Sequence, residues 1–529
     1  MVAYGNCIED FLTWLECASN CKCYFHNLGF DGTFLMDWLM KNGWLWVEDR
    51  SRASDKTFTC TISDMNQVYQ LTLFFTRTRY ATIQDSLKII PLSVASMAKA
   101  YGLEIRKGSI DYDEYRAPGH ELTDEELAYL ENDVAIVAKA MRAYLDQKLT
   151  KMTAGSNALY DYKQILGGHK AFRNVFPLLE QKEDEFIRKA YRGGFTYVNP
   201  KYQGYDVGEG IVLDVNSLYP SVMAACDGQL LPYGKPLWFD GEPEPTERRP
   251  LWVALVLCRF KIKAGHIPCV QMKGNNRFVQ TEYVEDSGER VAITITNVDW
   301  ELMQQQYHLA EVEFVGGYSF HANDSQFADY VEKWNDVKVR AAEEGNQGMR
   351  SVAKLMLNSL YGKFATRTKV RGRHPVLDEE GVVRYVDDAE EERDPVYLPV
   401  GVFITSYARY KTITSAQSVY DRFIYADTDS LHLVGTDVPE ELDVDPYRLG
   451  AWKHESTFES GKFLRAKTYV EKEVGSEKLT VHVAGLPSRC HEHVTLDNFE
   501  LGAVYEGNLV QKRVPGGIVL VEGTKELRR

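Results

Sequence analysis

Apolar and polar residues alternate with changing periods along the chain, and over the first 150 residues they predict a mixed α/β domain. An apolar strand leads through Asn27 and Asp31 into a helix. A further helix is expected to begin at Thr123, where a glutamate three residues later has the spacing of a capping box. That helix places Tyr129 and Asp133 four residues apart, and therefore on one face.

Beyond residue 150 the pattern predicts several bodies that differ in their elements. The expected order is a hinge at 191–195 (YRGGF), a buried strand at 210–215, a strand-rich stretch at 226–321, helices at 325–365, a charged, turn-rich stretch at 366–400, another helix, and a strand–turn–strand at 423–435. The helical stretch is interrupted by GNQG at 345–348. We therefore expect two helices that fold back as an antiparallel pair.

The length of 529 residues is too great for one ordinary core, so two or more domains are expected. No apolar run approaches the roughly 20 residues that cross a bilayer. The first ten residues lack the basic flank and apolar core of a signal peptide. A location in the cytosol is the resulting expectation. Nine cysteines are too few for a disulfide scaffold, which favours reduced thiols.

The net charge of −15 argues against a protein that simply coats nucleic acid, because phosphate binding requires cations. Basic residues nevertheless concentrate locally, at Lys363, Arg367, Lys369, Arg371 and Arg373. The acidic excess lies elsewhere, for example in DDAEEERD at 387–394. The sequence thus allows a basic channel in an acidic body.

Three carboxylates in two distant motifs predict a site for two divalent cations. Asp214 ends the buried strand in DVNSLYPS, and Asp427 and Asp429 lie in a turn in YADTDS. Joining a nucleotide to a 3′ hydroxyl uses two cations about 4 Å apart, and magnesium takes hard oxygen ligands. An Asp-x-Asp turn alone is weak evidence, because solvated turns favour aspartate. Combined with Asp214 and a lysine-bearing helix between them, it predicts template-directed nucleotidyl transfer.

That helix, in KLMLNSLYG at 354–362, carries polar groups along one stripe. Arg350, Lys354 and Asn358 have i, i+4, i+8 spacing, Tyr361 continues the face, and Lys338 lies level with Lys354 on the partner helix. A solvated basic face would have the same spacing. The small residues that flank Tyr361 favour instead a surface against which a base and sugar pack closely.

DVNSLYPS, KLMLNSLYG and YADTDS resemble the three polymerase motifs of the family B DNA polymerases. YRGGF, ITSYAR (404–409), LRAKTY (464–469), VPGG (514–517) and, nearer the amino terminus, HNLGFD, DSLK and KGSIDY are similar to motifs of the protein-primed phage branch, the phi-twenty-nine-like replicases. The resemblance covers essentially the whole chain. It implies an α/β multidomain fold. An incomplete RNase H-like exonuclease domain at the amino terminus would be followed by a right-hand polymerase with palm, fingers and thumb.

The resemblance also implies roles for individual residues. Asp214 and Asp429 are the expected main metal ligands, with the backbone of Val215 and with assistance from Asp427, for two Mg²⁺ ions that Mn²⁺ can replace. The expected nucleotide-binding residues are Tyr219, which would exclude a 2′ hydroxyl, Lys338, Arg350, Lys354, which is also expected in catalysis, Asn358, Tyr361 and Gly362. The expected DNA-binding residues are Tyr191, Gly193, Gly194, Thr405, Arg409, Lys467 and Tyr469.

The domain boundaries that the resemblance implies follow the chain order. They are an exonuclease-like domain at 1–152, a linker at 153–190, the palm at 191–225 and 399–486, a terminal-protein-region insertion at 226–324, the fingers at 325–365, a second such insertion at 366–398, and the thumb at 487–529. The second insertion is expected to be a hairpin that helps to enclose the DNA. The implied partners are primer–template DNA, dNTPs and a terminal protein that supplies the first hydroxyl. A virus-encoded monomer acting in a bacterial cytoplasm is expected.

The amino-terminal domain resembles the family's 3′–5′ exonuclease only in part. The matching residues are Asn27, Phe30, Asp31, Lys107, Tyr129 and Asp133. The first motif, a strand with Asp-x-Glu, has no counterpart, because the acidic residues before Asp31 fall in IEDFLTWLE, which has helical spacing. An internal start, a truncated gene and a genuine loss would look alike. We expect proofreading to be absent or severely reduced, and the sheet to expose an edge.

Two alternatives to an active polymerase belong to other functional classes. A catalytically silent DNA-binding or initiation scaffold would retain the fold, but it has no need of the whole set of carboxylates and cations. A nuclease working through the amino-terminal domain is disfavoured by the missing carboxylates.

Overall fold

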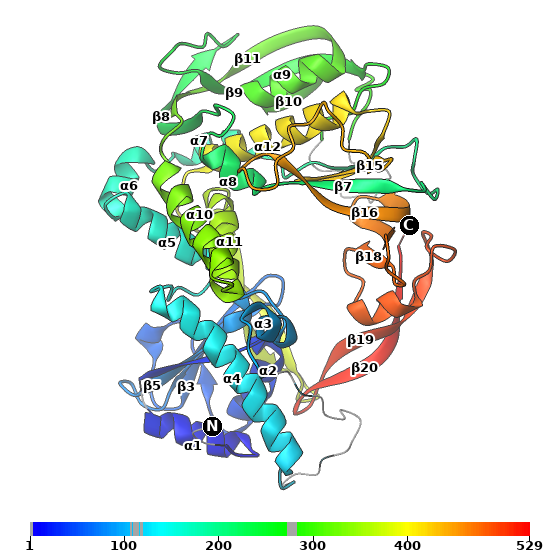
Figure 1. Cartoon of the computed structure of the whole chain (residues 1–529). Helices are drawn as coiled ribbons and strands as arrows, with labels where there is room; N and C mark the ends of the chain where they lie inside the picture. Colours follow the sequence, from blue (N-terminus) through cyan, green and yellow to red (C-terminus); the bar gives the residue numbers. More distant parts are fainter. Residues whose placement is uncertain are drawn as a thin grey trace.

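The computed structural model describes residues 4–18, 20–105, 108, 116, 120–271 and 283–528. Its elements surround an opening (Figure 1). Helices α10 (Ala328–Glu343) and α11 (Gln347–Phe364) lie on one side of it, and strands β19 (Val504–Val514) and β20 (Gly517–Glu526) lie on the other. In this view the first 150 residues lie below the opening and the sheet that carries β7 (Gly210–Val215) lies above it. None of the described helices combines the length and apolar character of a membrane span.

The amino-terminal domain is a sheet with helices packed against it. Its elements are α1 (Ile8–Ala18), β1 (Cys21–Phe25), α2 (Leu28–Lys41), β2 (Leu45–Trp46), η1 (Arg50–Arg52), β3 (Thr57–Ser63), β4 (Val68–Phe74), β5 (Tyr80–Asp85), η2 (Ser86–Lys88), α3 (Val94–Ala100) and α4 (Asp124–Asp146). The predicted capping box is confirmed, because Thr123 accepts from the Glu126 N–H and the Glu126 carboxylate accepts from the Thr123 N–H. Among the described residues β1 pairs with β5 alone, so it forms the expected sheet edge.

The charged stretch after α11 forms a hairpin that extends this sheet. Strands β12 (Lys369–Leu377) and β13 (Val383–Glu392) pair with each other, and β12 also pairs with β3 through Gly372 and Arg373. The hairpin places acids opposite the basic run, so that Arg371 and Arg373 lie 3.5 and 2.7 Å from Asp387. The expectation of a basic stretch separate from the acidic one is therefore wrong for these arginines.

The expected linker at 153–190 is three helices packed into the main core. They are α5 (Ala154–Ile165), α6 (His169–Val175) and α7 (Gln181–Arg188). Tyr162, Phe172 and Phe176 are fully buried and make stacked, tilted or edge-on ring contacts with Phe327 and Phe364 of the neighbouring segments. Aromatic residues that read as scattered in the sequence thus become one cluster, because three helices bring them together.

The central sheet has seven strands in the order β18-β17-β16-β7-β15-β14-β6. Besides β7 these are β6 (Thr196–Val198), β14 (Phe423–Asp427), β15 (Ser430–Val434), β16 (Trp452–Arg465), β17 (Thr468–Glu473) and β18 (Thr480–Val483). Helices α8 (Leu218–Met223) and α12 (Leu398–Ser418) accompany it. Because β7 lies inside the sheet, its side chains Ile211 and Leu213 are fully buried.

A second sheet covers the far side of α12 (Figure 1). Its order is β10-β9-β11-β8, built from β8 (Leu231–Asp240), β9 (Leu251–Ile262), β10 (Val291–Thr296) and β11 (Tyr307–Asn323), with α9 (Asn297–Gln306) between the last two in sequence. The helix pair α10–α11 turns back at Asn346, whose side chain accepts from the Met349 N–H. The predicted antiparallel pair is confirmed.

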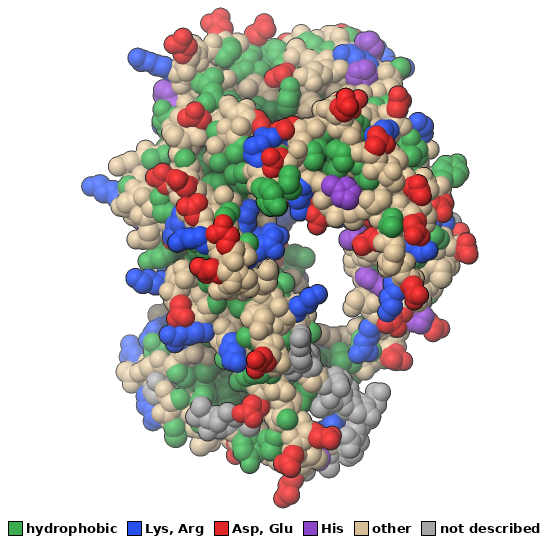
Figure 2. All heavy atoms as spheres, viewed as in Figure 1, with side chains coloured by type: hydrophobic (Ala, Val, Ile, Leu, Met, Phe, Trp, Pro, Cys, Tyr) green, Lys and Arg blue, Asp and Glu red, His purple; other side chains and the backbone are tan. Residues whose placement is uncertain are grey.

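The carboxyl-terminal hairpin β19–β20, preceded by η3 (Ser488–His493), reaches the amino-terminal domain. The Gly516 N–H donates to Asp37 of α2 over 3.1 Å, and the Arg513 guanidinium lies 3.7 Å from the centre of the Tyr385 ring of β13. A side chain at Gly517 would collide with Phe34. Segments from the two ends of the chain therefore close the opening, which Figure 2 shows.

Candidate active site

Asp214 and the Asp427–Asp429 turn meet at one end of three neighbouring strands. In the register of the sheet Asp214 lies opposite Ser430 on β15, and the Val215 N–H donates to the Asp429 carbonyl over 2.7 Å. Asp214 and Asp429 line one cavity of about 790 Å³ together with Asp427. The sheet register thus brings Asp214 to the two aspartates from which more than 200 positions separate it in the sequence.

The backbone around the carboxylates is held in unusual conformations. Ser217, Thr428 and Lys467 have φ values of 56°, 61° and 54°, which residues with side chains rarely adopt. Thr428 forms the turn between Asp427 and Asp429, and its N–H donates to the Phe195 carbonyl over 2.6 Å. Such conformations persist where surrounding contacts enforce them, and they cluster at functional sites.

Asp427 differs from the other two carboxylates because protein groups already occupy its oxygens. Its Oδ1 accepts from the Thr196 hydroxyl over 3.1 Å and lies 3.3 Å from the Lys467 ammonium, and its Oδ2 accepts from the Tyr425 hydroxyl over 3.4 Å. Asp214 has a weaker ion pair, 3.9 Å from the Lys453 Nζ. Asp214 and Asp429 are consequently the better candidates for metal binding.

The arrangement fits a hard divalent cation that also binds substrate oxygens. Among the described residues no group of three or more His, Cys, Asp and Glu side chains is placed to hold a metal alone. Burial, together with Asp429, raises the pKa of Asp214 to about 7, and burial also raises the pKa of Asp429. Two half-buried carboxylates, each with its charge opposed by burial and by a neighbouring aspartate, are suited to Mg²⁺, which needs few protein ligands when phosphates supply the others.

The polar stripe of α11 faces the same space, as predicted from its spacing. Arg350, Lys354 and Asn358 are exposed, whereas Val352 and Met356 on the opposite face are buried. Figure 2 shows basic side chains gathered over the helix pair beside the opening. Lys338 of α10 is half-buried, and burial and then the charges of Lys354 and Arg350 lower its pKa. The helix pair therefore presents a concentrated positive charge to the carboxylates.

Tyr219 and Tyr361 form the apolar wall of the cavity. Their rings stack with centroids 3.9 Å apart, Tyr219 coming from α8 and Tyr361 from α11. Both residues and Asn358 line the cavity of the carboxylates. A side chain at Gly362 would meet nothing within 4 Å. The contact between the rings joins α11 to α8, which follows β7 in the chain. The space beside Gly362 stays open.

The YRGGF segment packs against the turn between the aspartates. A side chain at Gly194 would lie 2.6 Å from the Thr428 hydroxyl, so glycine is required there, whereas Gly193 has open space. Tyr191 packs against the main core. Near the end of β16 the exposed Lys467 reaches Asp427, whereas Tyr469 is only 8% exposed and its ring stacks on His482 at 4.6 Å.

Comparison with known proteins places this arrangement in a family. A family model for type B DNA polymerases, organellar and viral, matches residues 17–117 and 113–445. The DNA polymerase of Bacillus phage Nf is 43% identical, that of Bacillus phage phi29 is 41% identical, and each match covers 98% of this chain and 92% of the relative. The DNA polymerase of Streptococcus phage Cp-1 is 34% identical, over 96% of this chain and 87% of its own.

The solved structure of phi29 DNA polymerase with primer–template DNA and incoming nucleotide superposes with a TM-score of 0.92. That match has 41% sequence identity and covers 99% of this chain and 94% of the other. This chain belongs to the phi29-type DNA polymerases of family B. The family, the enzyme class and the α/β multidomain polymerase fold that the motifs implied are thereby confirmed.

Two of the polymerase's predicted DNA contacts are buried inside it. Arg409 is 2% exposed and donates to both Asp299 oxygens and to the carbonyls of Arg192 and Gly193. Thr405 is 1% exposed, and its hydroxyl donates to the carbonyls of Gly401 and Val402. Their burial argues against direct DNA contact by these two side chains, which stays a prediction of the sequence. Arg409 instead holds the YRGGF segment through the carbonyls of Arg192 and Gly193. Thr405 bonds within its own helix, α12.

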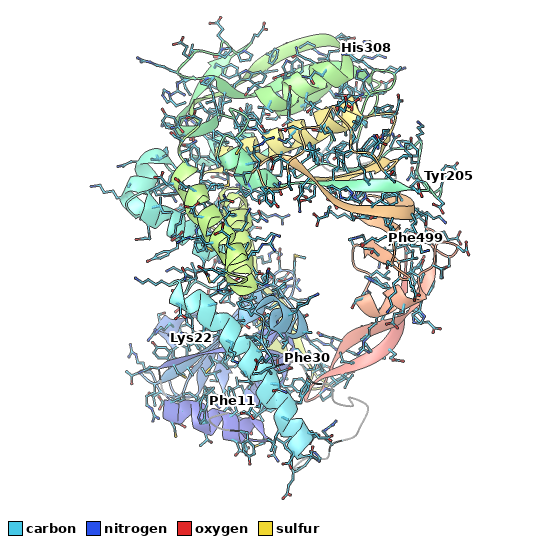
Figure 3. All side chains as sticks on the ribbon, in the orientation of Figure 1. Phe11, Lys22, Phe30, Tyr205, His308 and Phe499 are labelled. Atoms are coloured by element: carbon cyan, nitrogen blue, oxygen red, sulfur yellow. The ribbon has the colours of Figure 1, made fainter. Side chains whose placement is uncertain are left out.

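The residues that match the exonuclease motifs lie on different elements of the amino-terminal domain. Asn27 precedes α2 with φ of 71°, and its N–H donates to the buried Asp85 over 3.0 Å. Asp31 is exposed on α2, and Phe30, labelled in Figure 3, packs against Phe34. Tyr129 and Asp133 lie on α4, and Lys107 lies outside the described residues.

Sequence reasoning missed Lys453 and Glu455 of β16. Lys453 lies opposite Asp214 in the register, and Glu455 lines the cavity. Their i, i+2 spacing places both on one face of a strand, which was the available signal. The missing information was the pairing of β16 with β7, because the hydrophobic pattern does not specify a strand's partner.

The polymerase's dependence on magnesium should vary with pH, because Asp214 must lose its proton to bind a metal. Because the pKa of Asp214 is about 7, a proton competes with the metal for this carboxylate below pH 7. Well above pH 7 this competition is absent. We expect the magnesium concentration that gives half-maximal primer extension to rise about tenfold from pH 8 to pH 6. Saturating magnesium at pH 6 should restore the rate, and an equal magnesium requirement at both pH values would contradict the prediction.

Proposed function

We propose that this enzyme adds dNTPs to a 3′ hydroxyl on a DNA template, with two Mg²⁺ ions, or Mn²⁺, held by Asp214, Asp429 and the Val215 carbonyl. The observation that carries the proposal is the pair of half-buried carboxylates facing the cationic stripe of α11 across one cavity. When bound, the ions would lower the pKa of the hydroxyl and hold the leaving pyrophosphate. Asp427 positions the site through its bonds to Thr196 and Tyr425.

The triphosphate is assigned to the cations of the helix pair. Arg350, Lys354 and Lys338 would neutralise charge as it moves to the leaving group, which is the way fixed cations stabilise phosphoryl transfer. Asn358, Tyr361 and Gly362 would bound the nascent base pair. Primer extension on a primed single strand, with magnesium and four dNTPs, tests the proposal. Extension by the unmutated chain would also exclude the reading as a silent scaffold.

Tyr219 is proposed to select deoxyribonucleotides, because its ring is wedged against Tyr361 at the wall of the cavity. Tyr219→Ala should lower the ratio of kcat/KM for dCTP over CTP by about 10–100-fold, since only steric exclusion of one hydroxyl is removed. Tyr219→Phe keeps the ring and should keep the ratio. Single-nucleotide insertion kinetics measure it, and an unchanged ratio in Tyr219→Ala would count against this role.

Primer and template are assigned to the surfaces that flank the carboxylates. Lys467 and Tyr469 would hold the primer end, and Tyr191, Gly193 and Gly194 would contact the DNA. Lys467 supports this proposal because its side chain is 59% exposed although its ammonium reaches Asp427. Arg409 would act on DNA only indirectly, by holding the carbonyls of Arg192 and Gly193.

We further assign the expected domains to the observed elements. The central sheet would be the palm, α10–α11 the fingers, β19–β20 the thumb, and the β8–β11 and β12–β13 units the two insertions. The closed contact between the thumb tip and α2 supports a processive, strand-displacing enzyme, because DNA inside a closed opening does not leave sideways. A terminal protein would supply the first hydroxyl. The phage origin of the relatives supports a virus-encoded enzyme, and we propose that it acts as a monomer in a bacterial cytoplasm.

We propose, as the sequence predicts, that proofreading by this chain is absent or severely reduced. With a mismatched primer, magnesium and no dNTPs, the 3′ end should persist while a matched primer with dNTPs is extended. Asp133→Asn serves as the control and should leave the result unchanged. Removal of the mismatched nucleotide at a rate near that of polymerisation would overturn the proposal.

A further inference from the structure

Lys453 lies beside the proposed metal ligands, on the strand next to β7. It pairs with Asp214 in the register of β16 and β7, and its Nζ is 3.9 Å from the Asp214 Oδ1. Two residues further on, Glu455 forms an ion pair with the same ammonium. The Lys453 side chain is 29% exposed, and both of its acidic partners line the cavity. An ammonium group is thus present at the edge of the reaction site.

Lys453 also belongs to the group of cations that surrounds the cavity. Its charge acts on Asp214 and Asp429 from one side and on Lys338 from the other. Lys338 is in turn repelled by Lys354 and Arg350 of α11. Lys338 of α10 therefore lies in the field of three other cations, from α11 and β16, and a bound anion would relieve the repulsion between these like charges.

We propose that Lys453 is a further triphosphate-binding residue, contributed by the palm sheet, which pairs with Glu455 in the free enzyme and contacts phosphate oxygens of the bound nucleotide. The inference rests on the proposed function. A lysine ammonium suits this transfer because it carries three donors on a flexible stem and binds phosphate as a point charge. The contact is also made with free pyrophosphate in the reverse reaction, because the same phosphates are held there.

A different role for Lys453 predicts other kinetics. If it served only as a counter-ion that holds Asp214 and Glu455 together, it would compete with magnesium for those carboxylates. Its removal would then lower the magnesium concentration needed for half-maximal extension and leave the KM for dNTP unchanged. The two roles are distinguished by whether the KM for dNTP or the magnesium concentration for half-maximal extension changes.

The experiment measures single-nucleotide insertion and pyrophosphorolysis by Lys453→Ala, Lys453→Arg and the unmutated chain. At saturating magnesium, Lys453→Ala should raise the KM for dNTP about tenfold and the KM for pyrophosphate to a similar extent, with kcat within about twofold. Lys453→Arg keeps the charge and should stay within about threefold of the unmutated chain. A kcat that is retained shows that the variant is folded.

Lys472→Ala is the matched control, because Lys472 also pairs with a glutamate of β16, Glu459, over 3.0 Å. It should change neither KM. An unchanged KM for dNTP in Lys453→Ala, with or without a lower magnesium requirement, would overturn this inference alone. Failure of the unmutated chain to extend a primer would overturn the proposed function and this inference with it.

Discussion

Asp429→Asn should abolish primer extension, lowering kcat by on the order of 10³ or more, which corresponds to about 4 kcal/mol of transition-state stabilisation. A carboxamide is neutral, so it binds magnesium weakly and no longer balances the charge of the metal. Asp429 lies beside Asp214 in the same cavity, where we propose that both act as metal ligands. Extension of a primed single strand with magnesium and four dNTPs measures the loss.

Asp427→Asn is the internal comparison for this prediction. Its carboxylate already accepts from Thr196 and Tyr425 and pairs with Lys467, so its expected role is to position the turn. The loss in kcat should be smaller than for Asp429→Asn by at least about tenfold, and manganese should restore more of it. Both variants should unfold at the temperature of the unmutated chain. Equal extension by Asp429→Asn and the unmutated chain would remove our assignment of the metal site.

Arg409→Met should lower the free energy of unfolding by about 3–5 kcal/mol, because it leaves Asp299 charged and buried without its partner. In the native protein the Arg409 guanidinium lies 2.6 Å from an Asp299 oxygen and is 2% exposed. It also donates to the carbonyls of Arg192 and Gly193. In the variant the YRGGF segment should therefore lose its position, and primer extension should fall as well. Urea unfolding followed by tryptophan fluorescence measures the change.

Arg448→Met is the matched surface control. Arg448 pairs with Asp443 at side-chain exposures of 51% and 67%, so its removal should cost less than about 1 kcal/mol. A double variant, Asp299→Leu with Arg409→Met, should be more stable than Arg409→Met alone, because the buried carboxylate is removed together with its Arg409 partner. If Arg409→Met were as stable as Arg448→Met, the buried pair would have no such structural role.

Local features of this protein could be predicted from the sequence because short-range periodicity and caps determine them. The α10–α11 pair follows from helical spacing on each side of GNQG, and the capping box at Thr123 follows from one residue pair. The exposed stripe of Arg350, Lys354 and Asn358 also follows from spacing alone. The ordered motifs indicated the family, which the comparisons confirmed over nearly the whole chain.

The charges of the β12–β13 hairpin show where such reasoning ends. Arg371 and Arg373 read as part of a basic stretch, and only the strand register brings Asp387 beside them. Arg409 likewise matched a DNA-binding motif, whereas packing of α9 against α12 buries it on Asp299. In both cases the partner is distant in sequence, and the pattern of a single segment contains no information about it.

The family, many of the elements and the residue types of the candidate site follow from the sequence alone: Asp214, Asp427, Asp429 and the cations of α11. Tertiary contacts decide which of these groups are available. They tie Asp427 to Thr196 and Tyr425, and they place Lys453 beside Asp214. The physical reason is that local periodicity fixes the face on which a side chain lies, whereas sheet register and burial, which depend on distant segments, fix what it meets there.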